Sequence, residues 1–165
     1  MAVVDSIFEG LVLILPAMIA NATPVIAGGK TPIDMGINFV DGRRLLGKGK
    51  TWEGLVAGIL AGTFTGVLLT ALHSEMWWIG FTVSVGAMAG DLTASFLKRR
   101  LNMESGAPAP IIDQLNYYVG AVAALYLVGY EFTLPVLLLL ALIAGLLHFL
   151  ANVLAYIMGL KEHPW

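Results

Sequence analysis

Five long apolar segments dominate this sequence of 165 residues. We place them at residues 7–27, 55–72, 77–97, 111–130 and 134–160. A membrane-spanning helix needs about 20 mainly apolar residues, so each segment is long enough to cross a bilayer. Because backbone polar groups find no water in lipid, such segments fold as helices. The sequence therefore predicts an all-α, polytopic membrane helix bundle with five transmembrane helices, forming one domain over residues 1–165.

Composition agrees with this membrane class. Hydrophobic residues make up 58% of the chain and charged residues 12%, whereas a soluble domain is about half apolar and a quarter charged. The chain has no cysteine, which excludes disulfides, thiolate metal sites and cysteine nucleophiles. The first segment lacks a basic flank, so we expect it to be retained and not cleaved as a signal peptide.

The basic residues predict the orientation in the membrane. All nine Lys and Arg lie between the first and second segments, between the third and fourth, or after the fifth. Five crossings place these three regions on one side, which the positive-inside rule identifies as cytosolic. We therefore expect the N-terminus outside, the C-terminus in the cytosol, and a long cytosolic loop at residues 28–52. This multi-pass protein of the cell membrane would have an active site facing the cytosol.

Polar residues near the end of the third segment indicate chemistry. Asp91, Ser95 and Lys98 are spaced i, i+4, i+7 and share one helical face. Asp113 and Asn116 share a face at the start of the fourth segment. Two carboxylates at one membrane edge beside basic residues suggest a divalent cation and a phosphate-bearing substrate. The alternative is that each carboxylate only pairs with a basic residue or a helix terminus.

The first basic loop ends in a glycine-rich run, Gly47-Lys-Gly-Lys50-Thr51. Its glycines would let backbone N–H groups approach an anion, Lys50 supplies charge, and Thr51 could cap the next helix or bind phosphate. The full spacing of a P-loop is absent, so we reject a P-loop NTPase. The remaining alternative is a basic cluster attracted to anionic lipid headgroups.

Three patterns inside the segments bear on packing. Small residues at i+4 intervals predict close helix contacts, within the bundle or in a dimer; these are Gly54, Gly58, Gly62, Gly66, Gly86 and Gly90. Pro24 predicts a kink or break in the first helix. His148 and Asn152 form a polar stripe on the fifth, which we expect to hydrogen-bond across the bundle, with a substrate role as the alternative.

These residues resemble a known family. Gly90-Asp91-x-x-x-Ser95-x-x-Lys98-Arg99, followed by Asp113-x-x-Asn116, resembles the C-terminal signature of the CDP-diacylglycerol synthases. Lys50-Thr51-Trp52-Glu53-Gly54 is similar to an upstream stretch of that family. The wider loop sequence resembles its short archaeal branch, the CDP-archaeol synthases. Relative to the bacterial pattern, a His-Gly-Gly is missing and one carboxylate and one arginine are lost at residues 113–116.

The resemblance implies a reaction. CMP would pass from CTP to an archaeal ether-lipid phosphate, 2,3-bis-geranylgeranylglycerol 1-phosphate, giving CDP-archaeol and pyrophosphate in phospholipid biosynthesis. The partners would be CTP, an isoprenoid ether-lipid phosphate and the membrane, without nucleic acid. The cofactor would be Mg²⁺, as one or two ions, and the attack direct and in-line. The oligomeric state stays open.

The resemblance also implies roles for residues of this chain. Asp91, Asp113 and Lys98 would be catalytic, and the two aspartates would hold the metal. The residues expected to bind CTP or phosphate are Arg43, Arg44, Lys50, Thr51, Glu53, Ser95, Lys98, Arg99 and Asn116. Those expected at the lipid phosphate or in the cavity are Asn21, Lys30 and Asp34.

Two other functions compete with this one. A small ion or solute transporter would need polar residues reaching the outer face, yet the outer halves of the segments are almost wholly apolar apart from Asp5 and Glu9. A CTP-dependent lipid kinase would share the nucleotide, the metal and the membrane. It differs from a cytidylyltransferase only in its products, which are a phosphorylated lipid and CDP.

Overall fold

The computed structural model describes residues 2–161 and 163. Its elements are the strands β1 (Ala2–Val4) and β2 (Tyr130–Phe132) and the helices α1 (Ile7–Ala27), α2 (Trp52–Leu69), α3 (Met76–Arg100), α4 (Pro110–Leu127) and α5 (Leu134–Ile157). The predicted helical architecture is therefore confirmed. Four of these helices, α1, α2, α3 and α5, are long and apolar enough to cross a membrane. The first turns of α4 carry the polar residues Asp113, Gln114 and Asn116, and α4 is not among these four helices.

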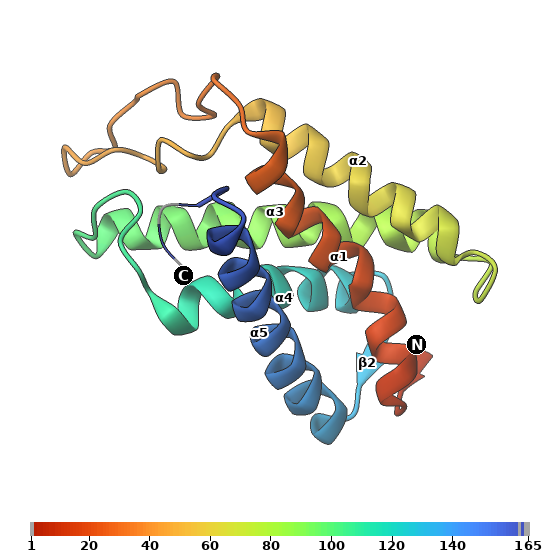
Figure 1. The fold of residues 1–165 in the computed structure, drawn as a ribbon. Coiled ribbons are helices and arrows are strands. Elements are labelled where there is room, and N and C mark those ends of the chain that lie inside the picture. The colour runs from red at the N-terminus through yellow and green to blue at the C-terminus, as the bar shows by residue number, and fades with distance from the viewer. Residues whose placement is uncertain (1, 162, 164–165) are drawn as a thin grey trace.

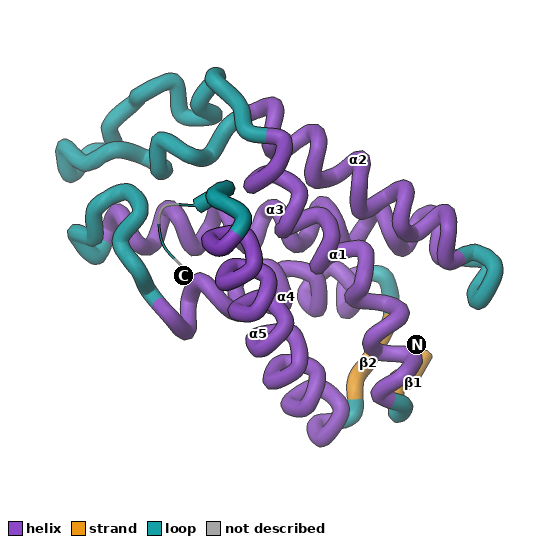
Figure 2. Tube along the Cα trace, in the orientation of Figure 1, coloured by secondary structure: helices purple, strands orange, loops and turns teal. Residues whose placement is uncertain are grey.

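Helix α3 is the centre of the arrangement and packs against α1, α2 and α4. Helix α5 packs against α1 and α4 (Figure 1). The core between the helices is apolar and includes the fully buried side chains of Ile14, Ile79, Val83, Tyr117 and Leu140. The α1–α2 loop, the basic end of α3 and the C-terminal segment lie at one end of the molecule (Figure 2). The three basic regions thus share a side, as their sequence positions predicted.

The glycine row of α2 packs inside the bundle. Gly54, Gly58, Gly62 and Gly66 are all buried. A methyl group on Gly58 would lie 2.6 Å from the Ala20 carbonyl oxygen of α1, and one on Gly66 would lie 2.7 Å from Gly80 Cα of α3. Glycine at these positions lets three backbones approach one another, which favours the bundle over a dimer as the role of the row.

Gly62→Val should therefore destabilise the bundle. A Cβ at Gly62 would lie 2.5 Å from the Pro16 carbonyl oxygen and would clash with the Ser84 hydroxyl. Such overpacking costs about 1–3 kcal/mol or more, and we expect a lower melting temperature in detergent. Leu60→Val, on a side chain that is 63% exposed on the same helix, is the control and should melt near the wild type. Equal melting temperatures for all three proteins would show that α2 can shift without cost.

Of the kink or break predicted at Pro24, the break is wrong, because α1 runs continuously from Ile7 to Ala27 with Pro16 and Pro24 inside it; the kink stays a prediction. A proline removes one N–H donor, so the carbonyl of Ala20 loses its partner in the helix. That carbonyl lies against Gly58 of α2, where close backbone packing covers it. The Thr23 hydroxyl donates to the Ile19 carbonyl at 2.7 Å and adds a local hydrogen bond.

Several helix ends differ from the predicted boundaries. Helix α2 begins at Trp52 and not at residue 55, because the Thr51 hydroxyl accepts a hydrogen bond from the Gly54 N–H at 3.2 Å and caps the helix. Helix α3 continues through its three basic residues to Arg100. Helix α5 ends at Ile157, before Gly159, whose φ of +71° reverses the chain.

A short parallel strand pair was not predicted. Ala2–Val4 of β1 pairs with Tyr130–Phe132 of β2, and Figure 2 shows the pair at the N-terminal end of α1, opposite the end that leads into the α1–α2 loop. Three residues are too few for an alternating pattern to be recognised in sequence. The pair ties the start of α1 to the connection between α4 and α5.

Candidate active site

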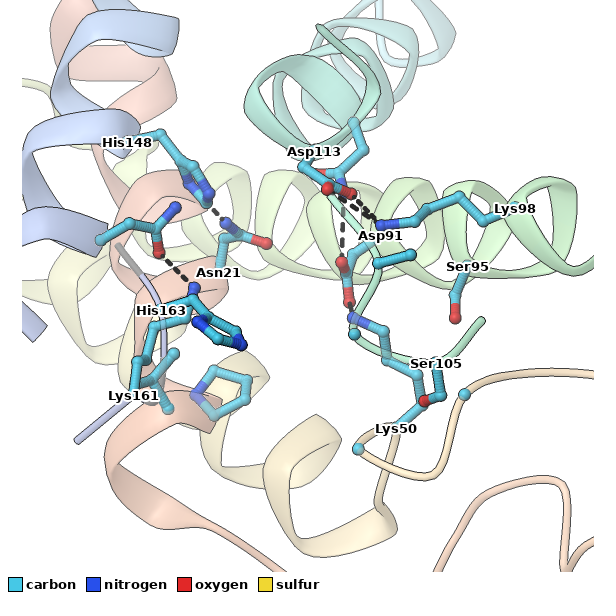
Figure 3. Close-up of a pocket in the computed structure, with 18 of the residues that line it drawn as sticks. Asn21, Lys50, Asp91, Ser95, Lys98, Ser105, Asp113, His148, Lys161 and His163 are labelled. Atoms are coloured by element: carbon cyan, nitrogen blue, oxygen red, sulfur yellow. Dashed lines mark hydrogen bonds and ion pairs between the residues drawn. The ribbon is translucent and has the colours of Figure 1, made fainter. Parts of the chain in front are cut away.

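A polar cavity of about 450 Å³ lies among α1, α3, α4, α5 and the α1–α2 loop. Its volume falls in the range of small-molecule sites. Figure 3 shows polar side chains of these elements converging on it. Eight of the residues predicted to form the site line the cavity: Asn21, Lys50, Asp91, Ser95, Lys98, Arg99, Asp113 and Asn116.

Asp91 of α3 connects three elements. Its Oδ2 accepts a hydrogen bond from Lys50 Nζ of the loop at 2.6 Å, and its Oδ1 accepts one from Asn116 Nδ2 of α4 at 3.2 Å. Asn116 comes this close because Gly90 packs directly against the Asn116 backbone. The glycine spacing of α3 thus sets the position of the carboxylate beside it.

Asp113 forms the second ion pair of the cavity. Lys98 Nζ of α3 donates to its two carboxylate oxygens at 2.8 and 2.9 Å. The Ala109 N–H donates to Oδ2 at 2.8 Å, so Asp113 also satisfies the start of α4, where a carboxylate is favoured. Both aspartates thus form ion pairs with basic residues, and both pairs line the same cavity (Figure 3).

Arg99 carries a polar group that the protein does not satisfy. Its side chain is buried, and its Nη2 donates to the Glu104 carbonyl at 3.0 Å. Its buried Nε has no hydrogen-bond partner among the residues that the structure describes. An unmet buried donor is costly, and this one belongs to a cation on the wall of the cavity. A phosphate oxygen would suit it.

The oxygen donors of the cavity fit part of a Mg²⁺ coordination shell. Within the described part of the chain, no group of three or more His, Asp or Glu side chains could hold a metal alone. The cavity instead offers the carboxylates of Asp91 and Asp113 together with the Ser95 hydroxyl and the Asn116 amide. Mg²⁺ commonly uses one or two carboxylates and completes its shell with water and substrate phosphates.

Asp34 and Arg44 lie outside the cavity lining and hold the loop together. Arg44 donates to the carboxylate through Nε at 2.8 Å and Nη2 at 2.7 Å, and the N–H groups of Gly36 and Leu46 complete its hydrogen bonds. These donors, led by the guanidinium, lower the pKa of Asp34 to about 2 although burial opposes the shift. The same pairing raises the pKa of Arg44. This pair stabilises the fold of the loop and does not line the cavity.

The other loop residues named from the sequence also lie outside the cavity lining. Glu53 accepts hydrogen bonds from the Thr31 hydroxyl at 2.7 Å and from the Lys30 N–H at 3.4 Å. Thr51, besides capping α2, donates to the Gly28 carbonyl at 3.2 Å. Arg43 donates to the Arg100 carbonyl at 2.8 Å. These contacts fix both ends of the loop and so position Lys50.

Asp34→Asn should destabilise the loop in a pH-dependent way. The folded pKa of about 2, against 3.8 for the free side chain, corresponds to about 2 kcal/mol of stabilisation. Because the folded pKa is the lower one, this stabilisation is complete above pH 3.8 and is lost as the pH falls through about 2. Melting curves should separate the two proteins near neutral pH and converge in acid. Asp5→Asn, on an exposed residue, is the control; a constant difference at every pH would contradict the assignment.

Sequence reasoning missed several lining residues. Ser105 accepts a hydrogen bond from the Lys48 N–H at 3.3 Å and brings the α3–α4 loop to the cavity, a contact without a sequence signature. Lys161 contributed only to the prediction of membrane orientation, yet it lines the cavity. His148 bonds to Asn21 of α1 at 3.0 Å, which confirms the contact across the bundle predicted for it. Asn152 instead accepts a hydrogen bond from Lys161, which follows its own helix, at 3.0 Å. Four further lining residues belong to patterns noted in the sequence, namely Pro24, Gly47, Gly49 and Asn152. The remaining missed residues that line the cavity are Val25, Gly106, Ala107 and His163.

Comparisons with known proteins agree with one another. A family model described as CarS-like, CDP-archaeol synthase, matches residues 3–165. A CDP-archaeol synthase of Aeropyrum pernix is 51% identical over 98% of this chain and 94% of its own length, and one of Methanopyrus kandleri is 47% identical over 95% and 92%. A solved structure, described as an intramembrane enzyme for archaeal membrane lipid biosynthesis, superposes with a TM-score of 0.88 at 48% identity, covering 93% of this chain and 98% of the other.

Proposed function

This chain belongs to the CDP-archaeol synthase family, and from that premise we propose how its cavity works. The enzyme transfers CMP from CTP to an archaeal lipid phosphate in membrane lipid biosynthesis. The observation that carries the mechanism is the pair of lysine-bound carboxylates, Asp91 and Asp113, on one cavity. In such a site the carboxylates balance the two lysine charges in the absence of substrate, and the lysines can bind anionic substrates when these arrive.

The transfer needs no covalent enzyme intermediate. An oxygen of the lipid phosphate attacks the α-phosphorus of CTP, the new P–O bond forms in line with the old one, and pyrophosphate leaves with the bonding electrons. Both reactants are anions that repel each other, so the main task of the protein is to position them and to offset their charge. We propose that the lipid substrate carries two geranylgeranyl chains in ether linkage.

Basic side chains of the cavity would bind the nucleotide phosphates. Lys50 and Lys98, which pair with the aspartates in this structure, would turn to phosphate oxygens, and Arg99 would offer its unmet Nε–H. Arginine and lysine form strong, charge-assisted bonds to phosphate. Ser95 and Asn116 line the same wall and would orient oxygens there. Arg44 and Asp34 would contribute indirectly, because they shape the loop that carries Lys50.

We propose that Asp91 and Asp113 hold Mg²⁺ when CTP is present. The bound ion would neutralise charge on the phosphates and on departing pyrophosphate. The freed ammonium groups of Lys50 and Lys98 would then face the substrates in place of the carboxylates. Hard oxygen ligands on two facing helices support this assignment.

We also propose that α4 completes five membrane crossings, with the cavity open to the cytosol. The three basic regions lie at the cavity end of the bundle, as the positive-inside rule requires of a cytosolic face. CTP is a cytosolic metabolite, so this orientation gives it direct access. Labelling of single cysteines placed at Val40 and His73 of this cysteine-free chain would test the orientation in intact cells.

The reaction itself can be tested with purified protein. Detergent-solubilised enzyme, Mg²⁺, labelled CTP and the ether-lipid phosphate should yield pyrophosphate and a labelled CDP-lipid in equal amounts. Release of CDP with transfer of a phosphoryl group would indicate a lipid kinase instead. Omission of Mg²⁺ should stop turnover, and its return should restore it; turnover in a chelator would contradict the metal assignment.

A further inference from the structure

The cavity has a second polar wall that the mechanism above does not use. Asp91, Asp113, Lys50 and Lys98 lie together on one side, whereas Asn21, His148 and Lys161 lie on the other, on α1, α5 and the C-terminal segment (Figure 3). Polar side chains in a membrane helix are costly and usually serve a function. On α5, His148 and Asn152 stand one turn apart in a helix that is otherwise mostly leucine and alanine.

The end of α5 directs Lys161 into this wall. Gly159 has a left-handed φ of +71°, its N–H donates to the Tyr156 carbonyl at 3.0 Å, and the Leu160 N–H donates to the Ala155 carbonyl at 2.9 Å. This pair of bonds is a Schellman motif, which ends a helix and reverses the chain. The next residue is Lys161, so the motif returns it to the cavity.

A hydrogen bond then fixes the ammonium group. Lys161 Nζ donates to Asn152 Oδ1 at 3.0 Å, and Asn152 is itself buried. Burial lowers the pKa of Lys161; Asp113 across the cavity opposes that shift, and Lys50 and Lys98 add to it. The ammonium group therefore interacts electrostatically with Asp113, Lys50 and Lys98. A bound anion would stabilise its charged form.

We propose that Lys161, held by Asn152, binds the phosphate monoester of the lipid substrate. This inference rests on the proposed function, which requires sites for two anions. Lys50, Lys98 and Arg99 serve the wall formed by α3 and α4, whereas Lys161 is the cation carried past the end of α5. Helix α5 is largely exposed on its outer side, so a lipid beside it would present its phosphate at the level of Lys161. The assignment places the two reacting phosphates on opposite walls.

Steady-state kinetics with both substrates varied separately test this assignment. Lys161→Met should raise the KM for the ether-lipid phosphate roughly 10- to 100-fold, with the KM for CTP unchanged, and Lys161→Arg should restore most of the loss. Asn152→Asp should also raise the lipid KM, because its carboxylate neutralises the ammonium group it holds. Lys48→Met, on an exposed loop lysine outside the cavity lining, is the matched control and should leave both constants unchanged.

The outcomes separate this inference from the proposed function. A rise in the KM for CTP, or no change in either KM with Lys161→Met, would overturn the role of Lys161 while CDP-lipid formation by the wild type still stands. A uniform loss of kcat with a lower melting temperature in both Lys161 variants would mean a structural role and would also overturn it. A wild type that forms no CDP-lipid would instead contradict the proposed function.

Discussion

Asp91→Asn should lower kcat by roughly 10³-fold and leave the protein folded. The substitution keeps the shape of the side chain but removes the anion that faces Lys50 at 2.6 Å. It therefore removes a proposed metal ligand and leaves the Lys50 ammonium without its partner between turnovers. We expect pyrophosphate release to fall to near background at saturating CTP and lipid, with the melting temperature within a few degrees of the wild type.

Asp41→Asn provides a matched control for that experiment. Asp41 also forms an ion pair, with Arg100 at 2.8 Å, but it lies in the loop outside the cavity lining. Ion pairs near the surface contribute about 0–1 kcal/mol, so turnover should stay near that of the wild type. If both variants lost activity equally, the effect would come from loop folding and not from the cavity. If neither did, Asp91 would be a structural partner of Lys50 only.

A dependence on Mg²⁺ distinguishes the two roles of Asp91 further. If the carboxylate holds the metal, the residual activity of Asp91→Asn should need a higher Mg²⁺ concentration. If it only positions Lys50, the Mg²⁺ dependence should match that of the wild type, and Lys50→Met should have the same effect as Asp91→Asn. Titrating Mg²⁺ for the three proteins therefore separates metal binding from positioning.

The helices were predictable because their signals are local. Each apolar segment is about as long as a membrane-spanning helix, and the row from Gly54 to Gly66 predicts close packing by its spacing alone. The face shared by Asp91, Ser95 and Lys98 follows from helical periodicity, and these three residues line the cavity. The prediction of a break at Pro24 was wrong because the effect of a proline on a helix depends on its surroundings. Here the Ala20 carbonyl packs against Gly58 of α2, a contact that sequence position does not reveal.

The loop residues were harder to assign because a basic side chain does not indicate its partner. Arg44 and Lys50 have similar charge and lie six positions apart, yet Arg44 pairs with Asp34 within the loop and Lys50 reaches Asp91 on α3. Only the folded path of the loop separates these cases. Lys161 was missed for a related reason, since its place depends on the chain reversal at Gly159.

Gly90→Ala should cost most of the activity through a single methyl group. A Cβ at this position would clash with the Asn116 backbone carbonyl and would lie 3.1 Å from Gly120 Cα. Backbone atoms cannot rotate away, so α3 and α4 must separate, and Asp91 must move relative to Asn116 and Asp113. A misplacement of about 1 Å at a reacting centre costs on the order of 10²-fold in rate, and we expect a loss of that size.

Gly145→Ala on α5 is the control, since its Cβ would meet Leu115 at an ordinary contact distance of 3.5 Å, and its activity should stay near the wild type. Measuring the melting temperature of each variant together with its rate separates a loss of stability from a displacement of the site. If Gly90→Ala lost activity while its melting temperature fell by only a few degrees, the spacing of α3 and α4 would be tuned for the site as well as for packing. If Gly90→Ala kept full activity, the two helices would adjust without moving the carboxylates, and the close contact would serve stability alone.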